Sequence, residues 1–172
     1  SMENITSTRN TIEYDLYIVN DGSTSIKLAA CAYGINYNPA ILNGVTPGVA
    51  ATQVAANSRT RALNTLNEYS LLNTNQDHFN QLRMTMKPVR LNNAVELQAN
   101  VPYKVGHFKF TNNKDWAVNS NPMFALNEFN VPGISTSCAT GYVDANTNPK
   151  GFSVAQKNLS VKVVNSPVLN PS

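Results

Sequence analysis

Hydrophobic and polar residues alternate along most of this chain, and this pattern predicts short β-strands. The clearest case is TIEYDLYIV, residues 11–19. One face of that segment carries Ile12, Tyr14, Leu16 and Ile18. The other face carries Glu13, Asp15 and Tyr17. Side chains two residues apart in a strand point to the same side, so the first set is expected in the core and the second at the surface.

The same alternation recurs in segments separated by turns rich in Asn, Gly, Pro and Ser. These segments are residues 25–30, 33–37, 81–88, 94–101, 103–112, 135–145 and 159–165. Strands of this length and spacing are typical of an all-β fold, and we expect an antiparallel β-sandwich of seven to nine strands. The residues expected inside are Ile12, Tyr14, Leu16, Ile18, Tyr33, Ile35, Tyr37, Phe108 and Phe110.

One region, residues 45–80, shows little alternation and is interpreted as a long inserted loop. Leu63, Leu66 and Tyr69 could form one side of a short helix within it. Loops of this length usually carry function or an added edge strand. The rest reads as one domain, residues 1–165, followed by a linker at 166–172, and the opening Ser1-Met2 resembles a cloning remnant ahead of an excised domain.

Composition narrows the possible partners. Charged residues make up 13% of the chain, about half the usual share, and Asn, Ser and Thr take their place, which favours an extracellular module. The net charge is +3, and the basic residues are dispersed, so we expect no nucleic-acid partner. No apolar run approaches the roughly 20 residues of a membrane span.

Two cysteines, Cys31 and Cys138, lie far apart and in no metal-binding spacing. They either form one disulfide between the two sheets of the sandwich or are two small buried apolar residues.

Catalytic groups are scarce, and we expect no enzyme. The histidines are His78, in a polar loop, and His107, on a strand. Glu13 and Asp15 share a strand face about 7 Å apart, which we interpret as an exposed charged surface.

We expect no cofactor. Calcium is the alternative, with oxygens from Asn112–Asp115 and from the loop that begins at Asp144, but Asn and Asp are also the usual turn formers.

Exposed aromatic side chains are the candidates for glycan binding. Tyr17 points away from the predicted core, and Trp116 follows the turn residues NNKD. The competing interpretation is that Tyr17 packs across strands and that Trp116 covers one end of the core. Tyr103 and Tyr142 are further, less specific candidates.

Two stretches resemble cohesin-like domains, a group of bacterial β-sandwiches related to carbohydrate-binding modules. The first ends in Tyr37-Asn38-Pro39 followed by Ile41 and Leu42, where the proline ends the strand and Leu42 turns back to cover the end of the sandwich. The second is VGHFKFTNNKDWAVNSNPMFALNEFN, residues 105–130, with GYVDANTN at 141–148, which is similar to secreted domains of bacteria that use type IX secretion.

The resemblance implies a secreted or cell-surface, non-catalytic jelly-roll module that binds a polysaccharide or an extracellular protein within a larger protein. A structural spacer in an adhesin or filament is the alternative. A small hydrolase ranks last.

Overall fold

Strands dominate the computed structural model, which describes residues 1–45, 51–55, 71–73, 76–77, 80–86, 94–126 and 139–143. Within these ranges there are eleven strands, one 3-10 helix and no α-helix. All strand pairings are antiparallel, as the alternation predicts. The all-β class is therefore confirmed for the described part of the chain.

The first sheet has the strand order β1-β2-β9-β4. Its members are β1 (Met2–Ser7), β2 (Thr11–Val19), β9 (Pro102–Asn112) and β4 (Ala51–Ala55). The two central strands pair along their whole length, from Thr11 opposite Thr111 to Val19 opposite Pro102. Residues 83 to 100 positions apart in the sequence thus face each other across this ladder.

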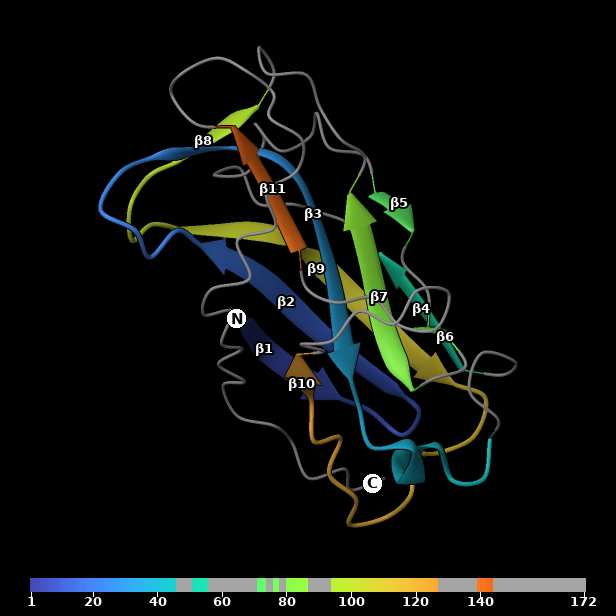
Figure 1. Cartoon of the computed structure of the whole chain (residues 1–172). Coiled ribbons are helices and arrows are strands. Elements are labelled where there is room, and N and C mark those ends of the chain that lie inside the picture. Colours follow the sequence, from blue (N-terminus) through green and yellow to red (C-terminus); the bar gives the residue numbers. More distant parts are fainter. Residues whose placement is uncertain are drawn as a thin grey trace.

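The second sheet is built around β3 (Ile26–Asn36) and has the order β10-β3-β7-β5. Its other members are β7 (Gln81–Met86), β5 (Leu71–Asn73), β6 (Gln76–Asp77), β8 (Val95–Leu97), β10 (Ala125–Leu126) and β11 (Ala139–Val143). In Figure 1 the long strands β3 and β7 lie over β2 and β9 of the first sheet.

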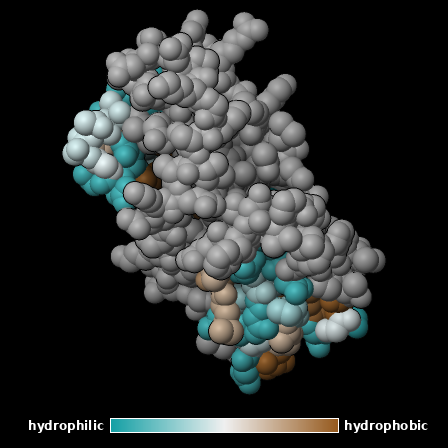
Figure 2. Space-filling view, viewed as in Figure 1, coloured by the Kyte–Doolittle hydropathy of each residue, from teal (hydrophilic) through white to brown (hydrophobic). Residues whose placement is uncertain are grey.

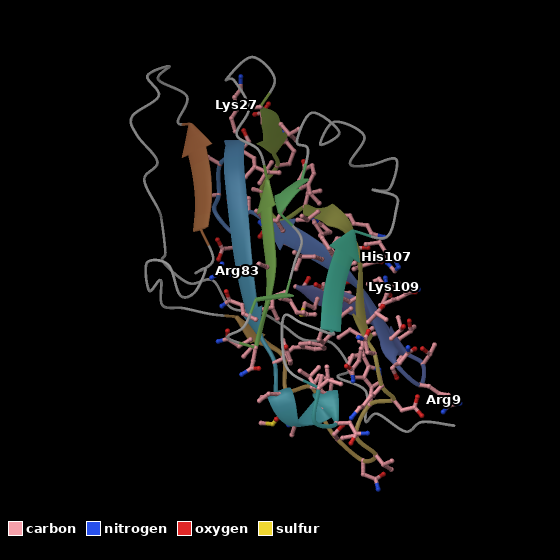
Figure 3. The ribbon with its side chains drawn as sticks, turned by 90° about the vertical axis from the view of Figure 1, so that its right-hand side faces the viewer. Arg9, Lys27, Arg83, His107 and Lys109 are labelled. Carbon is pink, nitrogen blue, oxygen red and sulfur yellow. The ribbon has the colours of Figure 1, made fainter. Side chains whose placement is uncertain are left out.

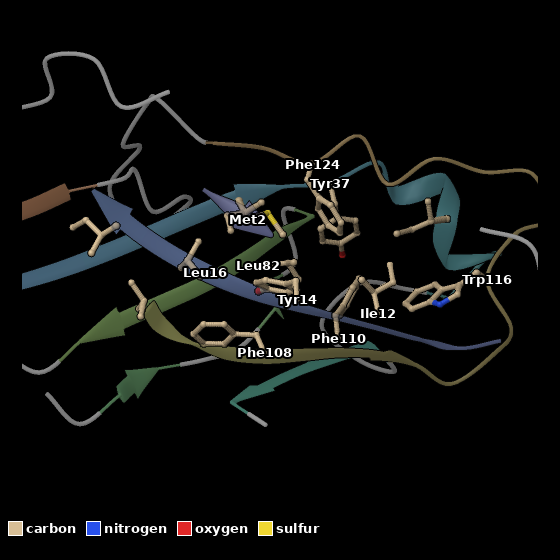
Figure 4. Packing of buried hydrophobic residues seen from close by; sticks show 14 of the residues in the cluster. Met2, Ile12, Tyr14, Leu16, Tyr37, Leu82, Phe108, Phe110, Trp116 and Phe124 are labelled. Carbon is tan, nitrogen blue, oxygen red and sulfur yellow. The ribbon is translucent and has the colours of Figure 1, made fainter. Parts of the chain in front are cut away.

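One hydrophobic core draws its side chains from both sheets. Ile12, Tyr14, Leu16, Ile18, Ile35, Tyr37, Phe108 and Phe110, all predicted inside, are buried. The rings pack closely: Tyr14 and Phe108 are stacked with centroids 5.5 Å apart, and Tyr37 and Phe110 are tilted with centroids 5.1 Å apart (Figure 4). The side chain of Tyr33 lies outside the described residues.

The Tyr-Asn-Pro segment ends β3 as predicted. Pro39–Leu42 forms the 3-10 helix η1, and Asn38 caps it by accepting a hydrogen bond from the Ala40 amide at 3.1 Å. Ile41 and Leu42 are buried in the core. An Asn at the cap satisfies an amide that the first turn of a helix leaves free, so the chain can turn back sharply and fold two apolar side chains over the core.

One expectation about the elements needs correction. The insert at 45–80 contains strands β4, β5 and β6, so interpreting it as a loop was wrong for its described residues; the alternative of an added edge strand is confirmed by β4, which borders β9. Met2 pairs with Leu16 in β1 and is fully buried, so it is part of the sheet. That Ser1-Met2 is a cloning remnant stays a prediction.

Some predictions fall outside the described residues or lack a test. They include the short helix around Leu63, the linker 166–172 and Cys138. Cys31 lies in β3, opposite Thr140, and β11 begins directly after Cys138. That strand pairs with β3 in the same sheet, not in the opposing one. The disulfide stays a prediction, as does the number of seven to nine strands.

No helix in the described ranges is long and apolar enough to cross a membrane. The end of the molecule formed by η1 and residues 113–124 is mainly hydrophilic, with separate hydrophobic spots (Figure 2). Val118 and Met123 are the exposed large apolar side chains of that loop.

Candidate functional site

Charged side chains gather on the outer face of the first sheet, opposite the core. Alternation in β2 puts Glu13, Asp15 and Tyr17 there. The ladder places them opposite residues of β9, with Glu13 facing Lys109, Asp15 facing His107 and Tyr17 facing Lys104. We call Glu13, Asp15, Lys104, His107 and Lys109 together the charge row.

A β-bulge in β9 brings Lys104 into the charge row. Leu16 pairs with Gly106 and Tyr17 with Lys104, so Val105 is an extra residue on β9. Val105 is buried, and from this point toward the N-terminus the alternation is shifted by one residue. Without the shift, Lys104 would point into the core. The bulge therefore places an ammonium group beside Asp15.

Gly106, next to the bulge, leaves room for the Phe108 ring. A Cβ atom at this position would lie 3.2 Å from both Cε2 and Cζ of the Phe108 ring. Such a contact is tighter than normal carbon–carbon packing, so the aromatic ring occupies the space that a side chain would need.

The buried end of the charge row is an ion pair. Lys104 Nζ lies 2.7 Å from Asp15 Oδ1, and the two side chains are only 10% and 9% exposed. The second carboxylate oxygen of Asp15 accepts a hydrogen bond from Asn4 Nδ2 at 2.9 Å. Asn4 is the extra residue of a bulge in β1 and has a φ of 51°, a left-handed conformation that Asn tolerates well.

His107 connects the buried end of the row to its exposed end. Its Nδ1 lies 2.8 Å from Asp15 Oδ1, and its Nε2 lies 3.1 Å from Glu13 Oε2. The other oxygen of Glu13 is 3.5 Å from Lys109 Nζ. His107 and Lys109 lie close together in Figure 3, while Lys27 and Arg83 lie on the other side, on the second sheet.

The surroundings shift the pKa of both carboxyl groups. Burial raises the pKa of Asp15, but hydrogen bonds from Lys104, Asn4 and His107 outweigh it, and the net pKa is lowered. The hydrogen bond from His107 is the largest influence on the pKa of Glu13 and lowers it, with Lys109 adding to the effect and slight burial opposing it. Both groups are therefore carboxylates at neutral pH.

Tyr17 lies on this face, as predicted. It is half-buried, and its backbone is fixed to the start of β1, because its N–H donates to the Ser1 carbonyl at 2.8 Å. Val19, two residues further along the same face of β2, is an exposed apolar side chain. The outer face thus continues from the charge row into a short apolar end.

Trp116 is not on this or any other accessible surface. Its side chain is 1% exposed, and its ring lies 5.3 Å from that of Phe110, centroid to centroid. The prediction of an exposed stacking platform is wrong for Trp116, and the alternative that it covers the end of the core is correct. The reason is the backbone: the Trp116 amide donates to the Arg9 carbonyl and the Ala117 amide to that of Ile41, which draws the loop inward.

The hydroxyl of Tyr103 is also used in hydrogen bonds within the fold. Its hydroxyl accepts a hydrogen bond from the Gln98 amide at 3.0 Å and donates one to the Glu96 carbonyl at 3.2 Å. This contact resembles the tyrosine corner of Greek-key domains, where a ring at the start of a strand fixes the preceding loop. The side chain of Tyr142, in β11, lies outside the described residues.

The proposed calcium ligands do not converge in the described residues. Asn112 donates its amide to the Leu42 carbonyl, and the carboxylate of Asp115 pairs with Arg9. The loop that begins at Asp144 is not described. Among the residues whose placement is known, no group of three or more His, Cys, Asp and Glu is arranged to hold a metal ion.

The charge row was only half visible in the sequence. The spacing of Glu13 and Asp15, and of His107 and Lys109, placed each pair on one strand face, but the register that joins the two strands could not be read. The interpretation of Glu13 and Asp15 as an exposed charged surface was wrong for Asp15, whose side chain is buried beside Lys104. No protein-family model, no curated protein and no solved structure matches this chain, so its sequence and geometry carry the functional argument.

Proposed function

We propose that this chain is a non-catalytic recognition module of a larger secreted or cell-surface protein, with a cohesin-like β-sandwich fold. Its ligand is a polysaccharide or an extracellular protein. One observation carries the proposal: the outer face of the first sheet combines a fixed row of polar side chains with the half-buried ring of Tyr17 and the exposed Val19. Ordered polar groups beside a flat apolar area are the usual parts of a recognition surface.

The row is pre-organised for binding. Asp15 and Lys104 hold each other inside the face, and Asp15 holds one side of the His107 ring. Glu13, His107 and Lys109 keep side-chain exposures of 37%, 27% and 41%, so they remain accessible to a ligand. Side chains that are already ordered lose less conformational entropy on binding, which favours affinity.

The arrangement of the row also favours binding over catalysis. An Asp–His pair is part of many hydrolytic sites, where the far ring nitrogen points at a nucleophile. Here the far nitrogen, Nε2 of His107, is 3.1 Å from Glu13 Oε2, a carboxylate that is held in a salt bridge. The pair thus resembles a cross-strand structural contact more than the activating half of a triad.

Affinity electrophoresis on a panel of polysaccharides tests the proposal. We expect at least one polysaccharide to retard the parent protein, and we expect Tyr17→Ala to weaken that binding about tenfold, the usual effect of losing an aromatic anchor. Val118→Ala is the matched control, because Val118 is an exposed apolar side chain in the loop after β9.

Three outcomes would change the proposal. If Tyr17→Ala migrates like the parent on a gel that retards the parent, the outer face is not the binding site. If no gel retards the parent, a protein partner should be sought by presenting the domain to extracellular proteins of its source. If neither binds, the spacer function becomes the better explanation, and the mutual pairing of the charges in the row favours it.

A further inference from the structure

His107 lies between two carboxylates, and this arrangement depends on its protonation. An ionised carboxylate only accepts hydrogen bonds, and a neutral imidazole has one N–H and one bare nitrogen. Both ring nitrogens are within hydrogen-bonding distance of a carboxylate oxygen, at 2.8 Å from Asp15 and 3.1 Å from Glu13. Both contacts can be hydrogen bonds only when the ring carries two protons.

The two contacts are not equally strong. Asp15 is buried and also held by Lys104 and Asn4, so it cannot move without breaking an ion pair. Glu13 is more than a third exposed, and its other contact is the longer one to Lys109 at 3.5 Å. When the ring loses one proton, the remaining N–H therefore stays on Nδ1 with Asp15. The bare Nε2 then faces Glu13, and the two lone pairs repel each other.

From this asymmetry we infer that the Nε2 proton of His107 is a latch that holds Glu13 against β9. With the proton present, Glu13 bridges His107 and Lys109 across the face. When the proton leaves to solvent, Glu13 swings outward and keeps only Lys109. The outer face then presents a free imidazole nitrogen and a mobile carboxylate in place of a closed ion pair.

Charge balance makes both states accessible. The row contains two carboxylates, Glu13 and Asp15, and two ammonium groups, Lys104 and Lys109. With a neutral ring these charges cancel, and a protonated ring adds a single positive charge. Neither state leaves a large uncompensated charge in the row.

The remaining neighbours of the ring do not change this conclusion. The titratable residues that share the outer face with the ring are Glu3 of β1, Glu13, Asp15 and Tyr17 of β2, and Lys104 and Lys109 of β9. Tyr14 of β2 and Tyr103 of β9 lie on the core face instead. Strand β4, on the other side of β9, contributes Ala51–Ala55, which includes no titratable residue. Glu3 accepts a hydrogen bond from the Ser1 hydroxyl and pairs across the ladder with Asp15, not with the ring.

A pH titration followed by NMR tests the latch on the intact chain. The carboxyl carbon of Glu13 should show two steps, its own protonation in acid and a second step with the same midpoint as the ring signal of His107. The carboxyl carbon of Glu3 is the internal reference and should lack the second step. The chain has one other histidine, His78, and the variant His78→Gln assigns the ring signals.

The variant His107→Gln supplies the second measurement. Its amide side chain can still donate to Asp15 but cannot titrate, so the second step of Glu13 should disappear while the backbone amide spectrum stays that of the folded parent. The inference is overturned if the His107 ring titrates and the Glu13 carbon does not follow. It is equally overturned if the ring never changes its protonation while the protein is folded, or if the second step persists in His107→Gln. None of these outcomes depends on the proposed function.

Discussion

Removing Lys104 tests whether the buried pair stabilises the first sheet. In Lys104→Met the flexible apolar chain fills the same space, but Asp15 keeps its charge in a site where it is 9% exposed. Breaking a buried ion pair by removing one partner costs about 3–5 kcal/mol. Because Asn4 and His107 still hydrogen-bond to Asp15, we expect the lower end of that range, about 3 kcal/mol.

The double variant Lys104→Met/Asp15→Leu removes both charges and so shows how much of the loss in Lys104→Met comes from leaving Asp15 unpaired. Replacing both members of a buried pair by apolar residues is often neutral, but here His107 also loses its partner. We expect the double variant to be less destabilised than Lys104→Met alone, by about 1–2 kcal/mol. With Asp15→Leu as the second single variant, a double variant that loses less stability than the two single variants added together shows that the two residues are coupled.

Urea unfolding at neutral pH measures both effects, with the fluorescence of Trp116, the single tryptophan, as a probe of the core. Arg9→Met is the matched control. It breaks the ion pair between Arg9 and Asp115, whose side chains are exposed, and should leave the midpoint almost unchanged. The reasoning is refuted if Lys104→Met behaves like Arg9→Met, or if the double variant loses as much stability as the two single variants added together.

Three further predictions concern the core, the bulge and acid stability. Trp116→Ala should lower the free energy of unfolding by about 3–5 kcal/mol, while Trp116→Phe should cost less, because it keeps a ring and removes an indole N–H that has no hydrogen-bond partner in the described structure. Gly106→Ala should cost about 1–3 kcal/mol in the same urea assay, because the new Cβ would press on the Phe108 ring; an unchanged midpoint would contradict this. The pKa of Asp15 is lowered in the folded state, so its stabilisation should be present above its unfolded value of about 4 and lost as the pH falls below it. Asp15→Asn should therefore flatten the stability curve between about pH 5 and pH 2, measured by thermal unfolding.

Alternation predicted which face of each strand is buried but not which strands become neighbours. Ile12 and Phe110 were both expected inside, and both are, because period-two patterning depends only on local sequence. The pairing of Asp15 with His107 depends on register, which long-range packing determines. The sequence therefore indicated the two halves of the charge row without showing that they form a single site.

Two predictions that were wrong, the loop at 51–55 and the exposed Trp116, failed for similar physical reasons. Ala51–Ala55 has a weak strand pattern, and the hydrogen-bond ladder that β9 offers at the sheet edge is what makes it a strand. Trp116 follows four polar residues, a context that favours exposure, yet two backbone hydrogen bonds from the loop draw its ring into the core. Both outcomes depend on partners distant in the sequence, which local patterning cannot supply.

The extra residue Val105 divides β9 into two parts, in which side chains alternate between core and surface with opposite phase. In the C-terminal part the even-numbered residues, such as Phe108, point into the core. In the N-terminal part Tyr103 points inward and hydrogen-bonds to the preceding loop. If β9 kept Val105 but lost the bulge, strict alternation from Phe108 would point Lys104 into the core and turn Tyr103 outward, away from the backbone groups it binds. A strand of the same sequence redesigned without the bulge would therefore lose its surface chemistry and its loop anchor in the same step, even though every side chain was retained.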